Sequence, residues 1–176
     1  AVAAGLLEPY DAINAVNLIG DEYKDPTNCW YGIYKGILGF MVNTEELERL
    51  GLEAPKTWDD LTKEEYKGLI MMSNPKLLIN TMVQMKGHDE AMKYFVELDK
   101  NIAQYTKSGS GPSKMVGPGE CVIAIGFLHD GIYQILQGYD NIQLIVPEDG
   151  TSFEVGATAI LKGASHPNAA KLWIEY

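Results

Sequence analysis

The feature that most constrains the fold is an alternation of short apolar runs with segments of helical pattern. Apolar runs that suit buried strands occur at Gly36–Val42, Leu69–Met72, Cys121–Gly126, Ile142–Val146 and Glu154–Leu161. Between them, apolar residues recur at the spacing of an amphipathic helix, as at Ala91, Tyr94, Phe95 and Leu98. Strands that alternate with helices are typical of the α/β class, so we predict an α/β fold.

Local signals predict where several helices begin. Asn43 is followed by Glu46, a capping-box pattern that predicts a short helix ending near residue 50. Thr62 and Glu65 show the same spacing and predict a second capped helix. Pro167 suits the first position of a last helix. The opening segment, residues 1–7, resembles the end of a helix closed by a glycine, and residues 169–176 resemble a helix without a cap. We therefore expect a fragment, or the ordered part, of a longer protein.

Charge excludes one class of function. The 176 residues carry 24 acidic and 14 basic side chains, a formal net charge of −10. A phosphate backbone recruits a basic face, so we expect no nucleic-acid partner. Arg49 is the only arginine, and an anion site must therefore use backbone amides, hydroxyls, His or Lys. Cys29 and Cys121 lack metal-ligand spacing, and we expect two free, buried thiols.

The first candidate binding segment is Ser108-Gly109-Ser110-Gly111-Pro112-Ser113. Small residues let a backbone approach a ligand closely, and hydroxyls donate hydrogen bonds. A helix beginning near Pro112 would add amides and a dipole that favour an anion. The segment fits neither a P-loop nor a dinucleotide-binding motif. The alternative is a flexible surface loop.

Further candidates follow strands or contain aromatic residues. His129 and Asp130 come directly after the predicted strand Cys121–Gly126, where ligands bind in open α/β sheets. The alternative is that Asp130 caps a helix and His129 is solvated. Glu154 is either a ligand residue or solvated, and Trp30 either forms an apolar wall or packs in the core. Ser73-Asn74-Pro75 is a second possible anion cradle. No nucleophile elbow or zinc-protease motif is present.

The order of several motifs resembles family 1 of the solute-binding proteins of ABC importers, the iron(III)-type group. The resemblance covers nearly the whole chain and rests on residues 5–10 (GLLEPY), 30–32 (WYG), 42–44 (VNT), 55–61 (PKTWDDL), 66–68 (YKG), 74–75 (NP), 119–120 (GE), 147–151 (PEDGT) and 169–171 (AAK). It implies two α/β lobes of the periplasmic-binding-protein type II, joined by crossing strands and closing on a ligand. Lobe two would be complete at residues 40–147, and lobe one partly present at residues 1–39 and 148–176.

The resemblance also implies a ligand class. Ferric-ion members have two tyrosines where this chain has His129 and Asp130, a pair similar to that of hexose-phosphate and phosphonate members. In those members an acid of lobe one, here Glu154, joins the pair in holding the solute. The phosphate would be held by hydroxyls and amides, for which Ser108, Gly109, Ser110 and Ser113 are the candidates. Asn80 and Thr81 would replace a Ser-Gly-Thr run, and Trp30 would line the site.

These features predict a binding protein rather than an enzyme, without a cofactor or resident metal. It would capture a small anionic solute between its lobes, in the periplasm or as a cell-surface lipoprotein, and deliver it to a membrane permease as a monomer. One alternative is a ferric-ion or other metal-binding member that uses His129, Asp130, Glu154 and a tyrosine. A remote alternative is an enzyme with His129 as a base beside Asp130.

Overall fold

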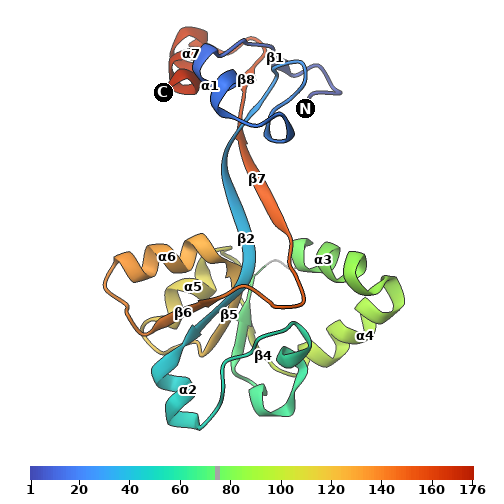
Figure 1. Ribbon diagram of the computed structural model, residues 1–176, viewed down its shortest axis with the longest axis vertical. Helices are drawn as coiled ribbons and strands as arrows, with labels where there is room; N and C mark the ends of the chain where they lie inside the picture. The colour runs from blue at the N-terminus through green and yellow to red at the C-terminus, as the bar shows by residue number, and fades with distance from the viewer. Residues whose placement is uncertain (74–75) are drawn as a thin grey trace. The chain divides into compact units, whose positions relative to one another are not determined.

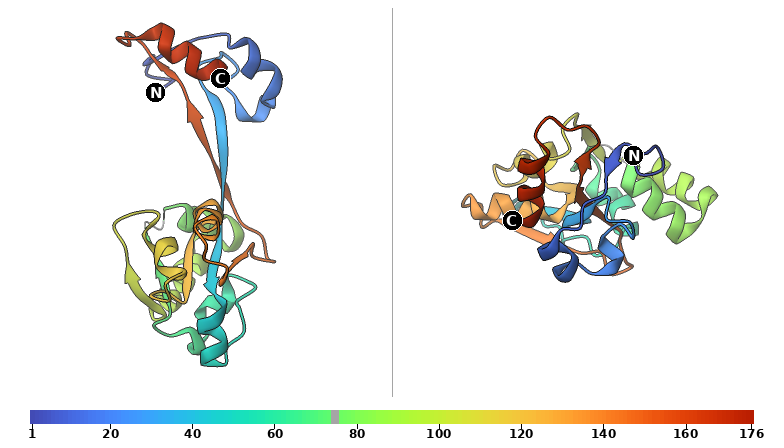
Figure 2. Two further views of the ribbon diagram at one scale, coloured as in Figure 1. Left: turned by 90° about the vertical axis from the view of Figure 1, so that its left-hand side faces the viewer. Right: turned by 90° about the horizontal axis from the view of Figure 1, so that it is seen from above.

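The long strand β2 (Tyr31–Asn43) links two separately packed parts of the chain in this computed structural model, which describes residues 1–73 and 76–176. Unit 1 comprises Ala1–Gly36 and Glu154–Tyr176, and unit 2 comprises Ile37–Phe153. Strand β7 (Phe153–Thr158) pairs with β2, and the two run side by side in Figures 1 and 2. We expected lobe boundaries at 39/40 and 147/148, whereas the units meet at 36/37 and 153/154; their identity with the family's lobes stays a prediction.

Unit 2 is built on a mixed sheet in the order β4-β3-β5-β2-β6. Its other strands are β3 (Ile70–Met72), β4 (Ile102–Tyr105), β5 (Ile123–Phe127) and β6 (Ile142–Ile145). β3 is parallel to both β4 and β5, whereas β2 is antiparallel to β5 and β6. Four strands therefore point one way and β2 points the other.

Helices cover both faces of this sheet, with α3 and α4 on one side and α5 and α6 on the other (Figure 1). Their bounds are α2 (Thr44–Leu50), α3 (Lys76–Lys86), α4 (His88–Asp99), α5 (Gly111–Val116) and α6 (Leu128–Leu136). Short 3₁₀ helices lie at Asp59–Thr62 and Glu64–Tyr66. The sheet is thus the middle of three layers, as expected for the α/β class.

Alternating side chains along the strands form the two cores of unit 2. Phe40 and Ile125 belong to the core under α3 and α4, where the Trp58 ring meets the Phe40 ring edge to face at 4.8 Å. Met41 and Ala124, their chain neighbours, belong to the core under α5 and α6. Successive strand residues point to opposite faces, so strands covered on both sides read as continuous apolar runs.

The end of unit 2 is bound to its beginning. The amide of Leu38 donates to the carbonyl of Ser152 at 3.1 Å, and the hydroxyl of Thr151 donates to the carbonyl of Leu38 at 2.8 Å. The indole of Trp58 donates to the carbonyl of Gly150 at 2.9 Å. The segment before β7 is therefore held against the first strand and the core of the same unit.

Unit 1 has a small core around Ala12, Ala15 and Tyr31. It contains β1 (Leu7–Glu8) paired with β8 (Ile160–Leu161), α1 (Ile13–Leu18), a 3₁₀ helix at Asp21–Tyr23, and α7 (Pro167–Glu175). Glu175 accepts hydrogen bonds from the amides of Ile13 and Asn14, both at 3.0 Å. The last residue of α7 thus caps the first turn of α1, which has no capping side chain of its own.

The structure confirms the α/β class and several local predictions. The Asn43 side chain accepts from the amide of Glu46 at 2.9 Å and opens α2, and α7 begins at Pro167. Both cysteines are free and buried. Three predictions about elements outside the candidate site need correction, as follows.

Thr62 does not cap an α-helix: its hydroxyl donates to the carbonyl of Asp59 and closes a 3₁₀ turn. The opening residues form a turn ending at Gly5 (φ 63°) before a strand, rather than a helix end. The predicted strand Glu154–Leu161 is two strands, β7 and β8, with different partners. The edge strand β4 was not predicted, because Ile102–Tyr105 is short and mostly exposed.

Candidate functional site

The carboxyl ends of three parallel strands lie side by side at one edge of the sheet of unit 2. In the parallel register of β3, β4 and β5, Met72 lies opposite both Tyr105 and Ile125. The ends of these strands therefore lie side by side, and the amide of Thr106, directly after β4, donates to the carbonyl of Met72 at 2.9 Å. Ligands of open α/β sheets bind outside the carboxyl ends of the strands. This edge is the candidate site.

A small pocket of about 70 Å³ opens at this edge. Its walls come from the strand ends, the start of α3 and the Ser-Gly loop, and include Leu38, Met72, Ser73, Gly109, Gly126 and Phe127. A Cβ added at Gly109 would meet no atom within 4 Å, so the loop backbone lies open at that position. The volume equals about two water molecules, enough for one small group of a ligand.

The Ser108–Ser113 segment forms the turn before α5 and the first half of that helix. The hydroxyl of Ser113 donates to the carbonyl of Ser110 at 2.9 Å, and this serine is 2% exposed. Its single hydrogen is therefore used within the helix, and Ser113 has no donor left for a solute in this conformation. The hydroxyls of Ser108 and Ser110, by contrast, have no hydrogen-bond partner among the residues that the structure describes.

His129 and Asp130 lie in the first turn of α6, directly after β5. His129 Nε2 is 4.0 Å from Asp130 Oδ1, and the two side chains are 45% and 28% exposed. The rings of Phe127 and His129 are stacked, with centroids 5.4 Å apart and planes 13° from parallel. Asp130 does not cap α6, whose N-cap is Phe127 with no side-chain hydrogen bond. The pair is thus reachable from solvent at the same edge as the pocket.

Asn80 and Thr81 differ in what they can offer a ligand. Asn80 is exposed on α3. Thr81 is 3% exposed, and its hydroxyl donates to the carbonyl of Leu77 at 2.7 Å. It also lies within hydrogen-bond distance of the Ser152 hydroxyl, which must donate because the hydrogen of Thr81 is used. Thr81 is thus part of the packing between α3 and the segment before β7.

Trp30 and Glu154 lie in unit 1. Trp30 is half-buried, and its carbonyl accepts from the amide of Asp25 at 3.0 Å. Glu154 is exposed on β7. The candidate residues are therefore divided between the two units. Trp30 and Glu154 belong to unit 1, and the others that lie at the strand-end edge belong to unit 2: Ser108, Gly109, Ser110, His129 and Asp130. The candidate cradle Ser73-Asn74-Pro75 lies outside the described residues, apart from Ser73, which lines the pocket.

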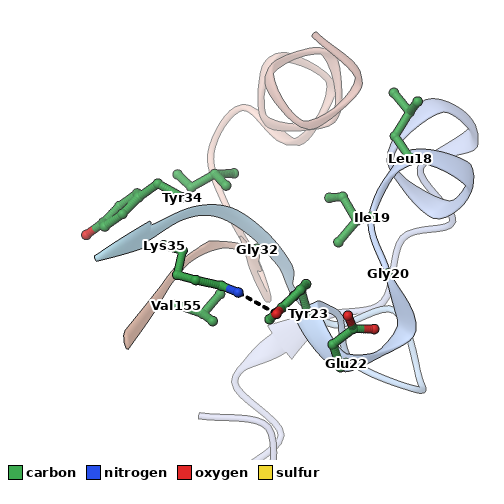
Figure 3. A pocket seen from close by; sticks show the side chains of 10 residues that line it. Leu18, Ile19, Gly20, Glu22, Tyr23, Gly32, Tyr34, Lys35 and Val155 are labelled. Carbon is green, nitrogen blue, oxygen red and sulfur yellow. Dashed lines mark hydrogen bonds between the residues drawn. The ribbon is translucent and has the colours of Figure 1, made fainter. Parts of the chain in front are cut away.

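Unit 1 has a larger pocket of about 390 Å³ (Figure 3). It lies between the end of α1 and strands β2 and β7, and the ammonium of Lys35 donates to the hydroxyl of Tyr23 at its wall. Leu18, Ile19 and Val155 make much of the lining apolar. None of the predicted site residues lines this pocket.

Two residues at the strand ends were missed by the sequence analysis. Phe127 both lines the small pocket and stacks on His129, and Thr106 starts the Ser-Gly loop with a bond to β3. The sequence did contain a signal for Phe127, because this aromatic residue stands at the end of an apolar run, two positions before His129. No such signal existed for Thr106, because β4 itself was not predicted.

Tyr105 ends β4 near this edge, and its hydroxyl donates to Asp99 at 2.5 Å. Desolvation of this half-exposed side chain first, and then its hydrogen bond to a carboxylate, raise the pKa of Tyr105 to about 12. The ring is therefore a neutral phenol at physiological pH. Within residues 1–73 and 76–176, no group of three or more His, Cys, Asp or Glu side chains is placed to hold a metal ion. No helix in the same part of the chain is long and apolar enough to cross a membrane.

Comparison with known proteins identifies the family of this chain. Residues 1–176 match the family described as bacterial extracellular solute-binding protein. An uncharacterized protein of Haemophilus influenzae is 40% identical over 187 residues, covering 100% of this chain and 54% of that protein. The chain thus spans about half the length of this curated relative.

Two solved structures share at least 30% sequence identity with this chain. The periplasmic binding protein AfuA of Actinobacillus pleuropneumoniae, with exogenous fructose-6-phosphate bound, is 41% identical with a TM-score of 0.88; the match covers 99% of this chain and 58% of AfuA. The periplasmic binding protein P5PA is 30% identical with a TM-score of 0.85, over 100% of this chain and 58% of P5PA. The match of the family over residues 1–176 and the likeness to these two structures show that this chain belongs to the bacterial extracellular solute-binding protein family.

Proposed function

We propose that this chain is part of the extracytoplasmic solute-binding component of an ABC importer, which captures a small phosphorylated or phosphonate solute and delivers it to the permease. The observation that carries the proposal is the meeting of three parallel strand ends at one edge of unit 2. This edge carries His129 and Asp130 together with the hydroxyls of Ser108 and Ser110, for which residues 1–73 and 76–176 supply no hydrogen-bond partner. The likeness to a structure with bound fructose-6-phosphate supports the same ligand class.

The chemistry of the edge suits a solute with an anionic end and a hydroxylated or amino end. The hydroxyls of Ser108 and Ser110 and the open backbone at Gly109 donate to phosphate oxygens, and hydrogen bonds to a charged group are stronger than neutral ones. Asp130 accepts from hydroxyls or an amine, and His129 adds one donor or acceptor. Exclusion of water on binding makes each of these bonds stronger.

The wider assignment follows from the family. Its members are bacterial extracellular proteins, and we propose a periplasmic or cell-surface location, a monomeric state and a membrane permease as the partner. Solute capture requires no bond to be made or broken, so the proposed protein is not an enzyme. Glu154, Trp30 and Asn80 remain proposed contributors to solute binding.

The test is calorimetric titration of the full-length protein that contains this chain. The probes are fructose 6-phosphate, fructose, inorganic phosphate, an aminoalkylphosphonate and Fe³⁺. Binding of a phosphorylated or phosphonate compound, with weaker or no binding of fructose, is the expected result. Binding of Fe³⁺ alone would replace the proposal by the ferric-ion alternative, and chemical conversion of a bound compound would replace it by the enzyme alternative.

Matched variants locate the site. Ser110→Ala removes one donor to the phosphate and is expected to weaken binding by about tenfold or more. Gly109→Ala adds a methyl group where no atom lies within 4 Å, so it leaves stability unchanged while crowding the solute. Ser165→Ala, at an exposed serine of unit 1, is the control and should bind like the parent. Equal affinities for all four proteins would place the solute elsewhere.

A further inference from the structure

Lys107 lies between the end of β4 and the Ser108–Ser113 segment, and hydrogen bonds hold the chain on both sides of it. The amide of Thr106 donates to the carbonyl of Met72 at 2.9 Å, and the hydroxyl of Thr106 donates to the carbonyl of Ser108, also at 2.9 Å. The same carbonyl of Ser108 accepts from the amide of Gly111 at 3.1 Å. The backbone of Lys107 is therefore held at the strand-end edge, directly before the Ser108 hydroxyl.

The side chain of Lys107 keeps its positive charge available. It is exposed, and its ammonium makes no hydrogen bond or ion pair with any residue in the described ranges 1–73 and 76–176. Other lysines of unit 2 are paired with carboxylates, as Lys63 is with Asp60 and Lys86 with Asp59, both at 2.7 Å. A carboxylate at that distance cancels much of the charge that a paired lysine could offer to a solute.

The candidate site needs a positive charge because its surroundings are acidic. Asp130 presents a partly exposed carboxylate at the same edge, and the whole chain has a formal net charge of −10. Like charges repel, so both oppose the approach of an anionic group. The hydroxyls of Ser108 and Ser110 donate hydrogen bonds but carry no formal charge, and they leave this repulsion in place.

We propose that Lys107 is a specificity-determining residue of the candidate site, whose ammonium favours a solute with a dianionic group over one with a monoanionic or neutral group. The inference rests on the proposed function, because it names the residue that selects the charge of the solute. A lysine ammonium is a compact point charge on a flexible stem and a common phosphate ligand. Its attraction grows with the charge of its partner, so a phosphate ester with two charges gains more than a sulfate ester with one.

The test compares Lys107→Gln, Lys107→Arg and Lys67→Gln in the full-length protein that contains this chain. Glutamine removes the charge, whereas arginine keeps it. Lys67 is the matched control, because it is exposed and lies before β3, at the end of that strand opposite the site. The two glutamine variants have the same net charge, so a difference between them depends on the position of the lysine. Thermal melting establishes that each variant is folded.

Affinities are measured by calorimetry at pH 8 for fructose 6-phosphate, fructose 6-sulfate and fructose. At this pH the phosphate ester carries nearly two charges, because its second pKa is about 6, and the sulfate ester carries one. Lys107→Gln is expected to bind fructose 6-phosphate about three- to tenfold more weakly than the parent, to bind the sulfate ester with a smaller loss, and to bind fructose unchanged. Lys107→Arg and Lys67→Gln should stay within about twofold of the parent for all three probes.

Salt provides a second readout that a change in structure would not move. The loss in Lys107→Gln should shrink as the salt concentration rises from about 0.01 M to about 1 M, because the Debye length falls from about 30 Å to about 3 Å. An equal loss for the phosphate and sulfate esters, or a loss that salt does not change, would overturn the proposal. Lys76 begins α3 beside the same pocket, and a loss confined to Lys76→Gln would also overturn it.

The outcomes separate this inference from the proposed function. If the parent binds fructose 6-phosphate and Lys107→Gln binds it equally well, the role of Lys107 is wrong and the proposed function stands. If the parent binds none of the phosphorylated or phosphonate probes, the proposed function fails and the role of Lys107 fails with it.

Discussion

Replacement of Thr81 by valine separates a packing role from a ligand role in the middle of α3. Valine has nearly the same shape, so the change removes the hydroxyl without opening a cavity. The lost interactions are the 2.7 Å bond to the carbonyl of Leu77 and the bond from Ser152. Leu77 remains satisfied because, as a residue within α3, its carbonyl also accepts from the amide four residues on.

The expected cost follows from these contacts. Two neutral hydrogen bonds contribute about 1–3 kcal/mol net, and the new buried methyl group returns about 0.8 kcal/mol. Thr81→Val should therefore lower the free energy of unfolding by about 1 kcal/mol, measured by urea denaturation of the full-length protein. A double-mutant cycle with Ser152→Ala should give a coupling of about 0.5–1.5 kcal/mol, because the two hydroxyls touch.

Solute affinity is the deciding measurement. Since the hydroxyl of Thr81 is buried and already bonded, Thr81→Val should change the affinity for fructose 6-phosphate less than twofold. Asn80→Ala, at an exposed neighbour on the same helix, should leave stability within about 0.5 kcal/mol of the parent. A Thr81→Val protein of unchanged stability that no longer binds the solute would refute the reasoning, as would a coupling of zero.

Three further predictions concern the rest of unit 2. The ion pair with Lys63 holds the pKa of Asp60 well below its usual range. The ionised Asp60 therefore stabilises the folded protein above about pH 4, and this stabilisation is lost as the pH falls toward the lowered pKa. Asp60→Asn should lower the free energy of unfolding by about 1 kcal/mol at pH 7. In thermal melts at acidic pH, the difference in stability between this variant and the parent should disappear. Burial raises the pKa of the Cys121 thiol to about 12, so alkylation at pH 8 should follow the rate of unfolding, and rapid labelling of the native protein would contradict this. Asn43→Ala removes both a helix cap and a 2.7 Å bond to the buried carbonyl of Val116, and should lower the free energy of unfolding by about 2–4 kcal/mol. Asn43→Asp keeps the cap acceptor and should lose less. A loss below about 1 kcal/mol for Asn43→Ala in urea denaturation would show that neither contact stabilises the fold.

Much of the fold was predictable because its signals are local. The run Gly36–Val42 is apolar at every position that faces either core, and Asn43 then caps the next helix through a residue three positions on. The failures also have local causes. Ile102–Tyr105 is a strand only because it lies beside β3, and Thr62 closes a 3₁₀ turn because a neighbouring carbonyl is within reach of its hydroxyl.

The grouping of the candidate residues was predictable in outline, and their hydrogen-bond partners were not. The rule that ligands bind beyond strand ends brought the Ser-Gly segment and the His129–Asp130 pair to one edge. The partners of individual hydroxyls depend on contacts between distant residues. Thr81 meets Ser152, 71 positions away, and no spacing in the sequence indicates that contact. Ser113 loses its donor to a carbonyl only because α5 begins where it does.

The division of the chain also sets an order of synthesis. Unit 2 is one uninterrupted segment, Ile37–Phe153, whereas unit 1 is split between the two sides of it. Every residue of unit 2 therefore leaves the ribosome before the second part of unit 1 does, and domains generally fold as units during synthesis. The first turn of α1 is capped by Glu175, and the core around Tyr31 includes Ile174, so neither can be completed before the end of α7 is available. Unit 2 is thus the first part of this chain able to fold, and a nascent chain of which residues 1–153 alone have left the ribosome should carry a folded unit 2 and an unfinished unit 1.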